Sequence, residues 1–360
     1  MAYTTIDKPD EHFNIVLWTG DASSDKSISG VGFQPDWVWA KNRSDSNDHQ
    51  MIDSNRGAGK ILRPNSTGVE LTRSSDAGAG GLQNFESDGF DVHSTTTNTN
   101  LNDNGELNVG WCWKANGGTT SSNSDGTITS TVQANTTAGF SIITYTGNFD
   151  TMTIGHGLSQ APEALIIKNR EHTNTSWVIY HKGLDFPTDD LIYFNTNAAN
   201  QHDPTFNNTA PSSSVITNGA YSFNNRNGNS HVCYAFHSVK GYSKFGKYKG
   251  NITSGSDGTF VYTGFKPAWL MVKSDSNAGQ EWVIFDNKRD SFNQMDAWLY
   301  ANASTAEDST GDERDVDFLS NGFKFRNAGG PTSYDGRTYI YFAFAEHPFV
   351  SSKGVPVTAR

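Results

Sequence analysis

The sequence has few cysteines and no long apolar run. Its two cysteines, Cys112 and Cys233, each lie in an aromatic, strand-like stretch, which predicts buried free thiols rather than a disulfide or metal ligands. No apolar run approaches the roughly 18 residues that span a bilayer, so we expect no membrane insertion. The first ten residues lack the charged start and apolar middle of a secretory signal, which predicts a soluble protein made in the cytoplasm.

Positive charge is also scarce. The chain has 27 lysines and arginines against 38 aspartates and glutamates, a formal net charge of −11. This balance repels a phosphate backbone and leaves no basic face for nucleic acid. We therefore expect no nucleic-acid partner.

The remaining composition indicates an all-β protein with little helix. Hydrophobic residues make up 35% of the chain, yet aromatic residues reach 12%, and there are 35 glycines and long Ser, Thr and Asn runs. Short strands joined by polar turns have this composition. Because 360 residues exceed the usual size of one domain, we expect two or three compact units.

An internal repeat occurs three times. The opening strand reads Phe13-Asn-Ile-Val-Leu-Trp-Thr-Gly20, then Phe140-Ser-Ile-Ile-Thr-Tyr-Thr-Gly147, then the weaker Phe245-Gly-Lys-Tyr-Lys-Gly250. Each copy has a proline 22 residues after its first phenylalanine, and a lysine six residues after that proline ends the next strand, at Lys41, Lys168 and Lys273. A repeated spacing of this kind indicates one structural unit used three times.

Later strands complete each copy. A strand follows at His49-Gln-Met-Ile-Asp53, Trp177-Val-Ile-Tyr-His181 and Trp282-Val-Ile-Phe-Asp286, and the closing strands are Val109-Gly-Trp-Cys-Trp113, Val232-Cys-Tyr-Ala-Phe236 and Ile340-Tyr-Phe-Ala-Phe344. Between them, Asp-Gly or Asn-Gly before an aromatic residue predicts a tight hairpin turn.

The repeat sets the expected domains. We predict three tandem antiparallel β-sandwiches of the jelly-roll or lectin-like kind at 13–115, 138–241 and 243–349, and a C-terminal tail at 350–360. The stretch 116–137 reads as a flexible linker or an extended crossing segment. Because the second and third units join directly, we expect them to pack more closely than the first and second. The variable loops 56–83, 184–214 and 288–317 are the expected binding surface.

No catalytic or metal-binding motif stands out. The sequence has no Gly-x-Ser-x-Gly, His-Glu-x-x-His or phosphate-loop pattern, and its histidines are scattered over different predicted strands and loops. The acidic segment 307–317 offers oxygen ligands but lacks the spacing of a calcium loop, so we interpret it as a solvated charged loop. We assign no cofactor, metal or catalytic residue.

Five residues are candidates for contact with a glycan or a partner. The tryptophans of the repeated strands are expected in the sandwich core, whereas Trp298 lies outside those strands and is free to stack on a sugar ring. Lys41 with Arg43, and Lys168 with Arg170, stand at strand ends. They would either hold a neighbouring chain's carboxylate or cap a sheet edge with charge, and the sequence leaves both interpretations open.

Several short motifs are spread over nearly the whole chain: Thr4-Thr-Ile-Asp-Lys-Pro9, Gly32-Phe-Gln-Pro-Asp-Trp-Val-Trp39, Lys41-Asn-Arg43, Trp111-Cys-Trp-Lys114, Lys168-Asn-Arg170 and Phe344-Ala-Glu-His-Pro348. In these motifs the chain resembles a family of repetitive proteins of tailed, mostly marine, bacteriophages. The third copy departs from it, with Lys273-Ser-Asp275 in place of Lys-Asn-Arg.

The resemblance implies a non-enzymatic virion structural protein with lectin-like sandwich units. Its expected place is the virion surface, as a tail-fibre-associated host-recognition component or, alternatively, a capsid decoration. Expected partners are other virion proteins, further copies in a symmetric homo-oligomer, and a host surface glycan. The rival from another class is a glycan-degrading tail enzyme with paired carboxylates.

Overall fold

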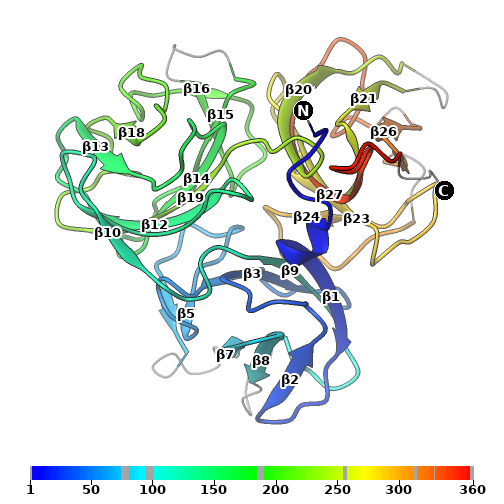
Figure 1. The fold of residues 1–360 in the computed structure, drawn as a ribbon, viewed down its shortest axis with the longest axis horizontal. Coiled ribbons are helices and arrows are strands. Elements are labelled where there is room, and N and C mark those ends of the chain that lie inside the picture. Colours follow the sequence, from blue (N-terminus) through cyan, green and yellow to red (C-terminus); the bar gives the residue numbers. More distant parts are fainter. Residues whose placement is uncertain are drawn as a thin grey trace.

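The computed structural model describes residues 2–73, 81–93, 101–184, 190–253, 258–310, 314–327 and 329–356. As predicted, the protein is all-β, with several antiparallel sheets. Within the described ranges the helical structure is a single 3-10 turn, η1 (Pro9–Glu11). Figure 1 shows three lobes, formed by residues 13–115 (blue to cyan), 138–241 (green) and 243–349 (yellow to red), here called the first, second and third segments.

Among the described residues, the strands follow one another without intervening helices. The first segment contains β1 (Phe13–Thr19), β2 (Lys26–Ser29), β3 (Trp37–Asn42), β4 (Gln50–Asp53), β5 (Lys60–Ile61), β6 (Leu71–Thr72), β7 (Gly81–Glu86), β8 (Gly89–His93) and β9 (Leu107–Trp113). Next come β10 (Ser121–Asn123) and β11 (Ser130–Asn135). The second segment contains β12 (Phe140–Thr146), β13 (Met152–Gly155), β14 (Ala164–Asn169), β15 (Val178–His181), β16 (Asp190–Tyr193), β17 (Gln201–His202), β18 (Val215–Asn218) and β19 (Ser230–Phe236). The third contains β20 (Ser243–Lys249), β21 (Phe260–Tyr262), β22 (Phe265–Ser274), β23 (Val283–Asp286), β24 (Leu299–Tyr300), β25 (Val316–Leu319), β26 (Gly322–Phe325) and β27 (Thr338–Pro348).

One strand order occurs in all three segments. The main sheets run β1-β9-β3-β4, β12-β19-β14-β15 and β20-β27-β22-β23, and the second and third of these continue into further strands. Each segment also has a smaller sheet, ordered β2-β8-β7, β13-β18 and β21-β26-β25. Matching strands and matching register therefore allow positions to be compared between segments.

Each main sheet is buried on both faces. Side chains alternate along a strand, so in β3 Trp37 and Trp39 point to one face while Val38 and Ala40 point to the other. Val38 and Ala40 join a core confined to the first segment, and the other two segments have cores of their own. The opposite faces of all three main sheets meet in one central core.

Aromatic side chains fill this central core. The Trp37 ring stacks on Trp113 of its own segment, with ring centroids 4.3 Å apart, and on Tyr234 of the second segment, at 4.4 Å. Trp269 of the third segment lies edge-on to Trp113 at 5.8 Å. In the second segment, Ala164 occupies the position that Trp37 and Trp269 occupy in the other two segments. Its small side chain leaves room for these two indole rings. The strand tryptophans are core residues, as expected. Trp18 packs inside the first segment, whereas the others fill the central core between segments.

The register corrects the sequence alignment of the third copy. Phe13 pairs with Trp113 and Phe140 with Phe236, whereas the residue opposite Phe344 is Ser243. The third opening strand therefore begins at Ser243, two residues before Phe245. The spacing of 22 residues in that copy was coincidental, because its loop before the proline is two residues longer.

The residues between the first and second segments are not a flexible linker. β11 pairs with β12 along Thr131–Thr144 to Asn135–Phe140 and adds to the sheet of the second segment. Of the two interpretations drawn from the sequence, the extended crossing is the one observed. We expected the second and third segments to pack more closely than the first and second. In the central core, however, all three segments contribute side chains.

Candidate functional site: the junctions between segments

The strand-end lysines are buried. Lys168 donates through Nζ to the Asn169 carbonyl at 2.9 Å, and to the Thr175 carbonyl at 3.0 Å and hydroxyl at 2.8 Å. Lys41 and Lys273 likewise donate to nearby backbone carbonyls. Burial lowers the pKa of Lys168 to about 7 and of Lys41 to about 8. These lysines hold the loop after the strand. The hydrogen bonds of Lys41 and Lys168 go to that loop, and not to a carboxylate or an exposed sheet edge.

The strand-end arginines bind carboxylates of a neighbouring segment of the same chain. Arg170 of the second segment holds Glu70 of the first through two bonds of 2.8 and 2.9 Å. Arg43 of the first segment holds Glu307 of the third in the same two-pronged way, at 3.0 and 2.6 Å. Planar guanidinium and carboxylate groups match in this geometry, which fixes orientation as well as charge.

A second, deeper arginine extends each network. Arg56 is fully buried and contacts Glu70 at 2.9 Å and Asp53 at 2.5 Å. Tyr234 of the second segment donates to the same Asp53 at 2.7 Å. Although burial opposes it, the bonds from Arg170 and Arg56 lower the pKa of Glu70. The first junction, between the first and second segments, is thus a connected ionic network.

The third junction, between the third and first segments, repeats this network. Arg289 pairs with Asp286 and also contacts Glu307 at 2.7 Å. Trp111 of the first segment, at the position of Tyr234, donates to Asp286 at 3.0 Å. The sequence contained a signal that we did not use, since Asp53-Ser-Asn-Arg56 and Asp286-Asn-Lys-Arg289 share an Asp-x-x-Arg after the fourth repeated strand.

The second junction, between the second and third segments, lacks the network at every matching position. His181 stands in place of the aspartate, Leu184 in place of Arg56, Asn200 in place of Glu70, and Asp275 in place of Arg170. The backbone contact is nevertheless kept, because Asn200 N donates to the Asp275 carbonyl at 2.9 Å, as Glu70 N does to Arg170 at 2.8 Å. The second junction therefore keeps the backbone contact without the arginine–carboxylate pairs of the other two junctions.

His181 is neutral in this setting. Its Nδ1 accepts from the Gly183 N–H at 3.0 Å, so Nε2 carries the proton and donates to the Tyr341 carbonyl at 3.1 Å. Burial lowers the pKa of His181 to about 3. The Phe342 ring beside it, at 5.1 Å, offers no hydrogen-bond donor where Tyr234 and Trp111 do.

A further contact also repeats around the molecule. Trp177 Nε1 donates to the Arg63 carbonyl at 2.9 Å, Trp282 Nε1 donates to the Tyr193 carbonyl at 3.2 Å, and His49 Nε2 bonds the Tyr300 carbonyl at 3.0 Å. Each contact runs from the residue just before β4, β15 or β23 to the preceding segment, where the acceptor is the loop residue Arg63 or the last residue of β16 or β24. The three junctions therefore form a closed ring, in which the loops predicted as a binding surface partly serve to join segments.

Trp298 is not a surface residue. Only 1% of it is exposed, within the core of the third segment, and the Arg314 guanidinium lies 4.9 Å from its ring centroid. This overturns the expectation that it is free to stack on a sugar. Cys112 and Cys233 are buried free thiols, as predicted. The acidic segment also differs from expectation, since Glu307 serves the third junction, while residues 311–313 lie outside the described residues.

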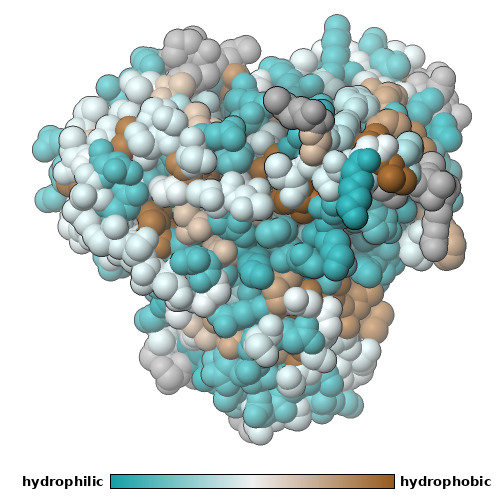
Figure 2. All heavy atoms as spheres, in the orientation of Figure 1, coloured by the Kyte–Doolittle hydropathy of each residue, from teal (hydrophilic) through white to brown (hydrophobic). Residues whose placement is uncertain are grey.

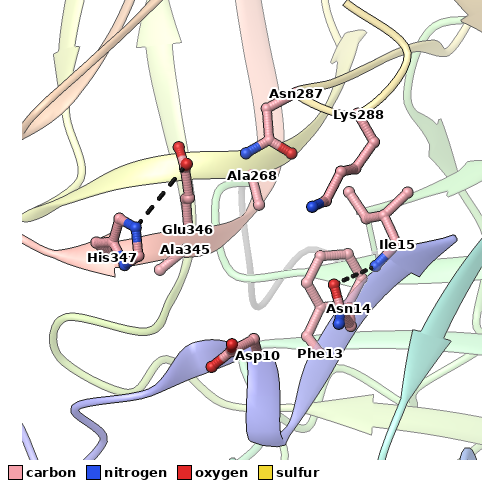
Figure 3. Close-up of a pocket in the computed structure, with 10 residues that line it drawn as sticks. All are labelled: Asp10, Phe13, Asn14, Ile15, Ala268, Asn287, Lys288, Ala345, Glu346 and His347. Atoms are coloured by element: carbon pink, nitrogen blue, oxygen red, sulfur yellow. Dashed lines mark hydrogen bonds and ion pairs between the residues drawn. The ribbon is translucent and has the colours of Figure 1, made fainter. Parts of the chain in front are cut away.

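The third junction carries a pocket of about 220 Å³ (Figure 3). β1 forms one wall through Phe13, Asn14 and Ile15, and Lys288 of the third segment extends toward that strand. Glu346 lies on the far side, where it pairs with Lys266 at 2.6 Å. In the view of Figure 2 polar residues cover most of the surface, and one small apolar group lies beside the contact of the lower and right-hand lobes.

Other chemistry is sparse in the part of the chain that the structure describes. There, no group of three or more His, Cys, Asp or Glu side chains is placed to hold a metal ion. Likewise, no helix of the described residues has the length and apolar character to cross a bilayer.

Residues 8–348 match the model of a family described as a domain of unknown function, DUF7483. The chain belongs to this family. The DUF7483 match covers all three segments and their junctions, so the family corresponds to the whole three-lobed body rather than to one copy of the repeat. No curated protein and no solved structure matches the chain.

Proposed function

We propose that this DUF7483 protein is a non-enzymatic structural component of a bacteriophage virion. In this proposal, residues 13–115, 138–241 and 243–349 are tandem copies of one β-sandwich unit, arranged around a shared axis as a single-chain counterpart of a trimer. The protein sits on the virion surface, associated with the tail fibre, and presents its outer loops to the host.

The observation that carries the proposal is the closed ring of junctions around one aromatic core. Three segments that share a core and bind one another through Arg170–Glu70, Asn200–Asp275 and Arg43–Glu307 contacts cannot hinge independently. Such a body resists deformation and offers three lobes at fixed angles, which suits a mechanical or display role. The sequence resemblance to phage virion proteins is the reason for placing this role in a virion.

Attachment to a symmetric particle favours a symmetric assembly of several copies. A tail component and a capsid decoration differ in copy number, and the tail-fibre role is preferred here on the sequence resemblance. The host ligand expected at the outer loops is a surface glycan.

Copy number in purified particles tests the proposal. Quantitative mass spectrometry against the major capsid protein should give a few to a few tens of copies per particle. A ratio near one per capsid subunit would support decoration and contradict the tail role. Absence of the protein from particles purified to constant composition would overturn the virion role itself.

A further inference from the structure

The outer edges of the three opening strands differ in what covers them. β12, in the second segment, is paired along its outer edge by β11, a strand of the same chain. β1 and β20 occupy the matching positions, and each is the last strand of its sheet. The pairing of β11 with β12 therefore shows how an added strand binds to the outer edge of an opening strand in this protein.

The pocket at the third junction lies where β11 would lie by this comparison. Phe13, Asn14 and Ile15 match Phe140, Ser141 and Ile142, because both triplets pair with equivalent residues of the closing strand. In the second segment these three residues pair with Asn135, Ala134 and Gln133 of β11. In the first segment the same three positions line the pocket.

The facing wall also corresponds. At the first junction, Ser54 and Asn55 follow Asp53, and Asn55 Nδ2 donates to the Thr131 carbonyl of β11 at 3.2 Å and to the Ile142 carbonyl at 3.1 Å. At the third junction, Asn287 and Lys288 follow Asp286 and line the pocket. Lys288, a donor without acceptors, extends toward β1 and is placed to donate to an added strand's carbonyl (Figure 3).

The outer edge of β1 has backbone groups available for pairing. The N–H groups of Gly20, Gly147 and Gly250 point to the closing strand at matching positions, so odd-numbered residues of β1 point outward. Consistent with this, the Ile15 N–H does not face β9 but bonds its neighbour Asn14 Oδ1 at 2.8 Å. Leu17, two residues on, is 41% exposed, whereas its counterpart Thr144 contacts Asn55.

We propose that the outer edge of β1, with the pocket beside it, is a docking site for an extended strand of a separate polypeptide. The strand lies antiparallel to β1, as β11 does on β12, with a small residue opposite Asn14 and amide side chains opposite Phe13 and Ile15. Main-chain hydrogen bonds supply the affinity and the pocket supplies the specificity. This site is independent of the virion role, since it requires only a partner with such a strand.

A fluorescent peptide with the sequence of residues 128–138 is the probe, and anisotropy is measured with the full chain. Leu17→Pro removes one outward N–H and should weaken binding at least tenfold, because proline is tolerated at a sheet edge but cannot donate. Leu17→Ser keeps the N–H and should change affinity less than threefold. Asn14→Ser, which introduces the residue of the second segment, frees the Ile15 N–H and should strengthen binding about fivefold.

Hydrogen exchange of the unaltered protein gives a test that does not depend on any variant folding. Peptide addition should slow exchange of the outward amides of β1 and leave those of β20 unchanged. No saturable binding, or protection at β20 in place of β1, would overturn the proposal. A dimer that dissociates in Leu17→Pro would place a second copy on this edge and equally overturn the assignment to a different polypeptide.

Discussion

Glu70 shows how a single carboxylate joins two segments. It sits between Arg170 and the fully buried Arg56, and its own side chain is 9% exposed. Removing one partner of such a buried network leaves uncompensated charge, which costs far more than losing a surface pair.

We therefore expect Glu70→Gln to lower the free energy of unfolding by about 2–4 kcal/mol. Denaturant unfolding measures it. Glu307→Gln, at the third junction, should give a similar loss. Glu11→Gln is the matched control, because the Lys8–Glu11 pair is exposed on both sides and should contribute nothing measurable. Equal effects of Glu70→Gln and Glu11→Gln would contradict the network.

His181 makes stability depend on pH. Its folded pKa is about 3, against an ordinary value of 6.5, so between these values the unfolded chain binds the proton and the folded one does not. Stability is complete above pH 6.5 and is lost as the pH falls toward 3. At the second junction, where His181 lies, Asp275 pairs with Lys247 of its own segment at 2.8 Å and makes no two-pronged bond with an arginine.

Relative to His181→Asn, the unaltered protein should lose about 2–3 kcal/mol more between pH 7 and pH 4.5. Urea unfolding at several pH values in that range provides the comparison. Parallel curves for the unaltered protein and His181→Asn would show that His181 is protonated in the folded state.

A glycine directly follows the opening strand in each segment, at Gly20, Gly147 and Gly250. A Cβ at Gly147 would lie 2.4 Å from the Arg226 carbonyl oxygen, and the contacts at Gly20 and Gly250 would be 2.0 and 2.3 Å. The repeated glycine is therefore required by a close approach of backbone, which any side chain would prevent.

Gly147→Ala should lower stability by about 2–3 kcal/mol, since rigid backbone must move to admit the methyl group. Gly59→Ala is the matched control, because its Cβ would meet only Arg73 Cβ at 3.8 Å. Thermal unfolding of both variants gives the test. A loss at Gly147 no larger than at Gly59 would mean that the strand end adjusts freely.

At the scale of the whole molecule, the shared core couples the three segments. Each main sheet would expose its central face if a neighbour unfolded, so partial unfolding uncovers large aromatic area. Calorimetry should therefore show one transition with equal calorimetric and van't Hoff enthalpies. Trp37→Ala should lower the free energy of unfolding by about 3–5 kcal/mol, and the unfolding should remain a single transition. Two or three resolved transitions would contradict a single body.

Local pattern explains what could be predicted. The all-β class, the three copies and the buried free cysteines follow from strand periodicity, turn residues and repeated spacing, which are properties of neighbouring residues. The start of the third opening strand was missed because an aromatic residue, Phe245, lay at the expected spacing. Only the pairing of Ser243 with Phe344 fixes that register.

The central core and the junctions could not be predicted, because they depend on contacts between residues that are far apart in the sequence. The same alternation of apolar residues fits a sheet that is covered by its own second sheet and one that is also covered by other segments. Only the packing of three main sheets decided that Trp37 and Trp269 meet in a common core. Likewise, Arg43 and Arg170 read as strand-end charges until the fold brought Glu307 and Glu70, far away in the chain, within hydrogen-bond distance. Local pattern in the sequence was enough to predict most of the strands and their threefold recurrence, because strand periodicity and repeated spacing are properties of neighbouring residues. The tertiary structure alone decided which residues are interior and which edge of β1 stays open, because both depend on how the three segments close on one another.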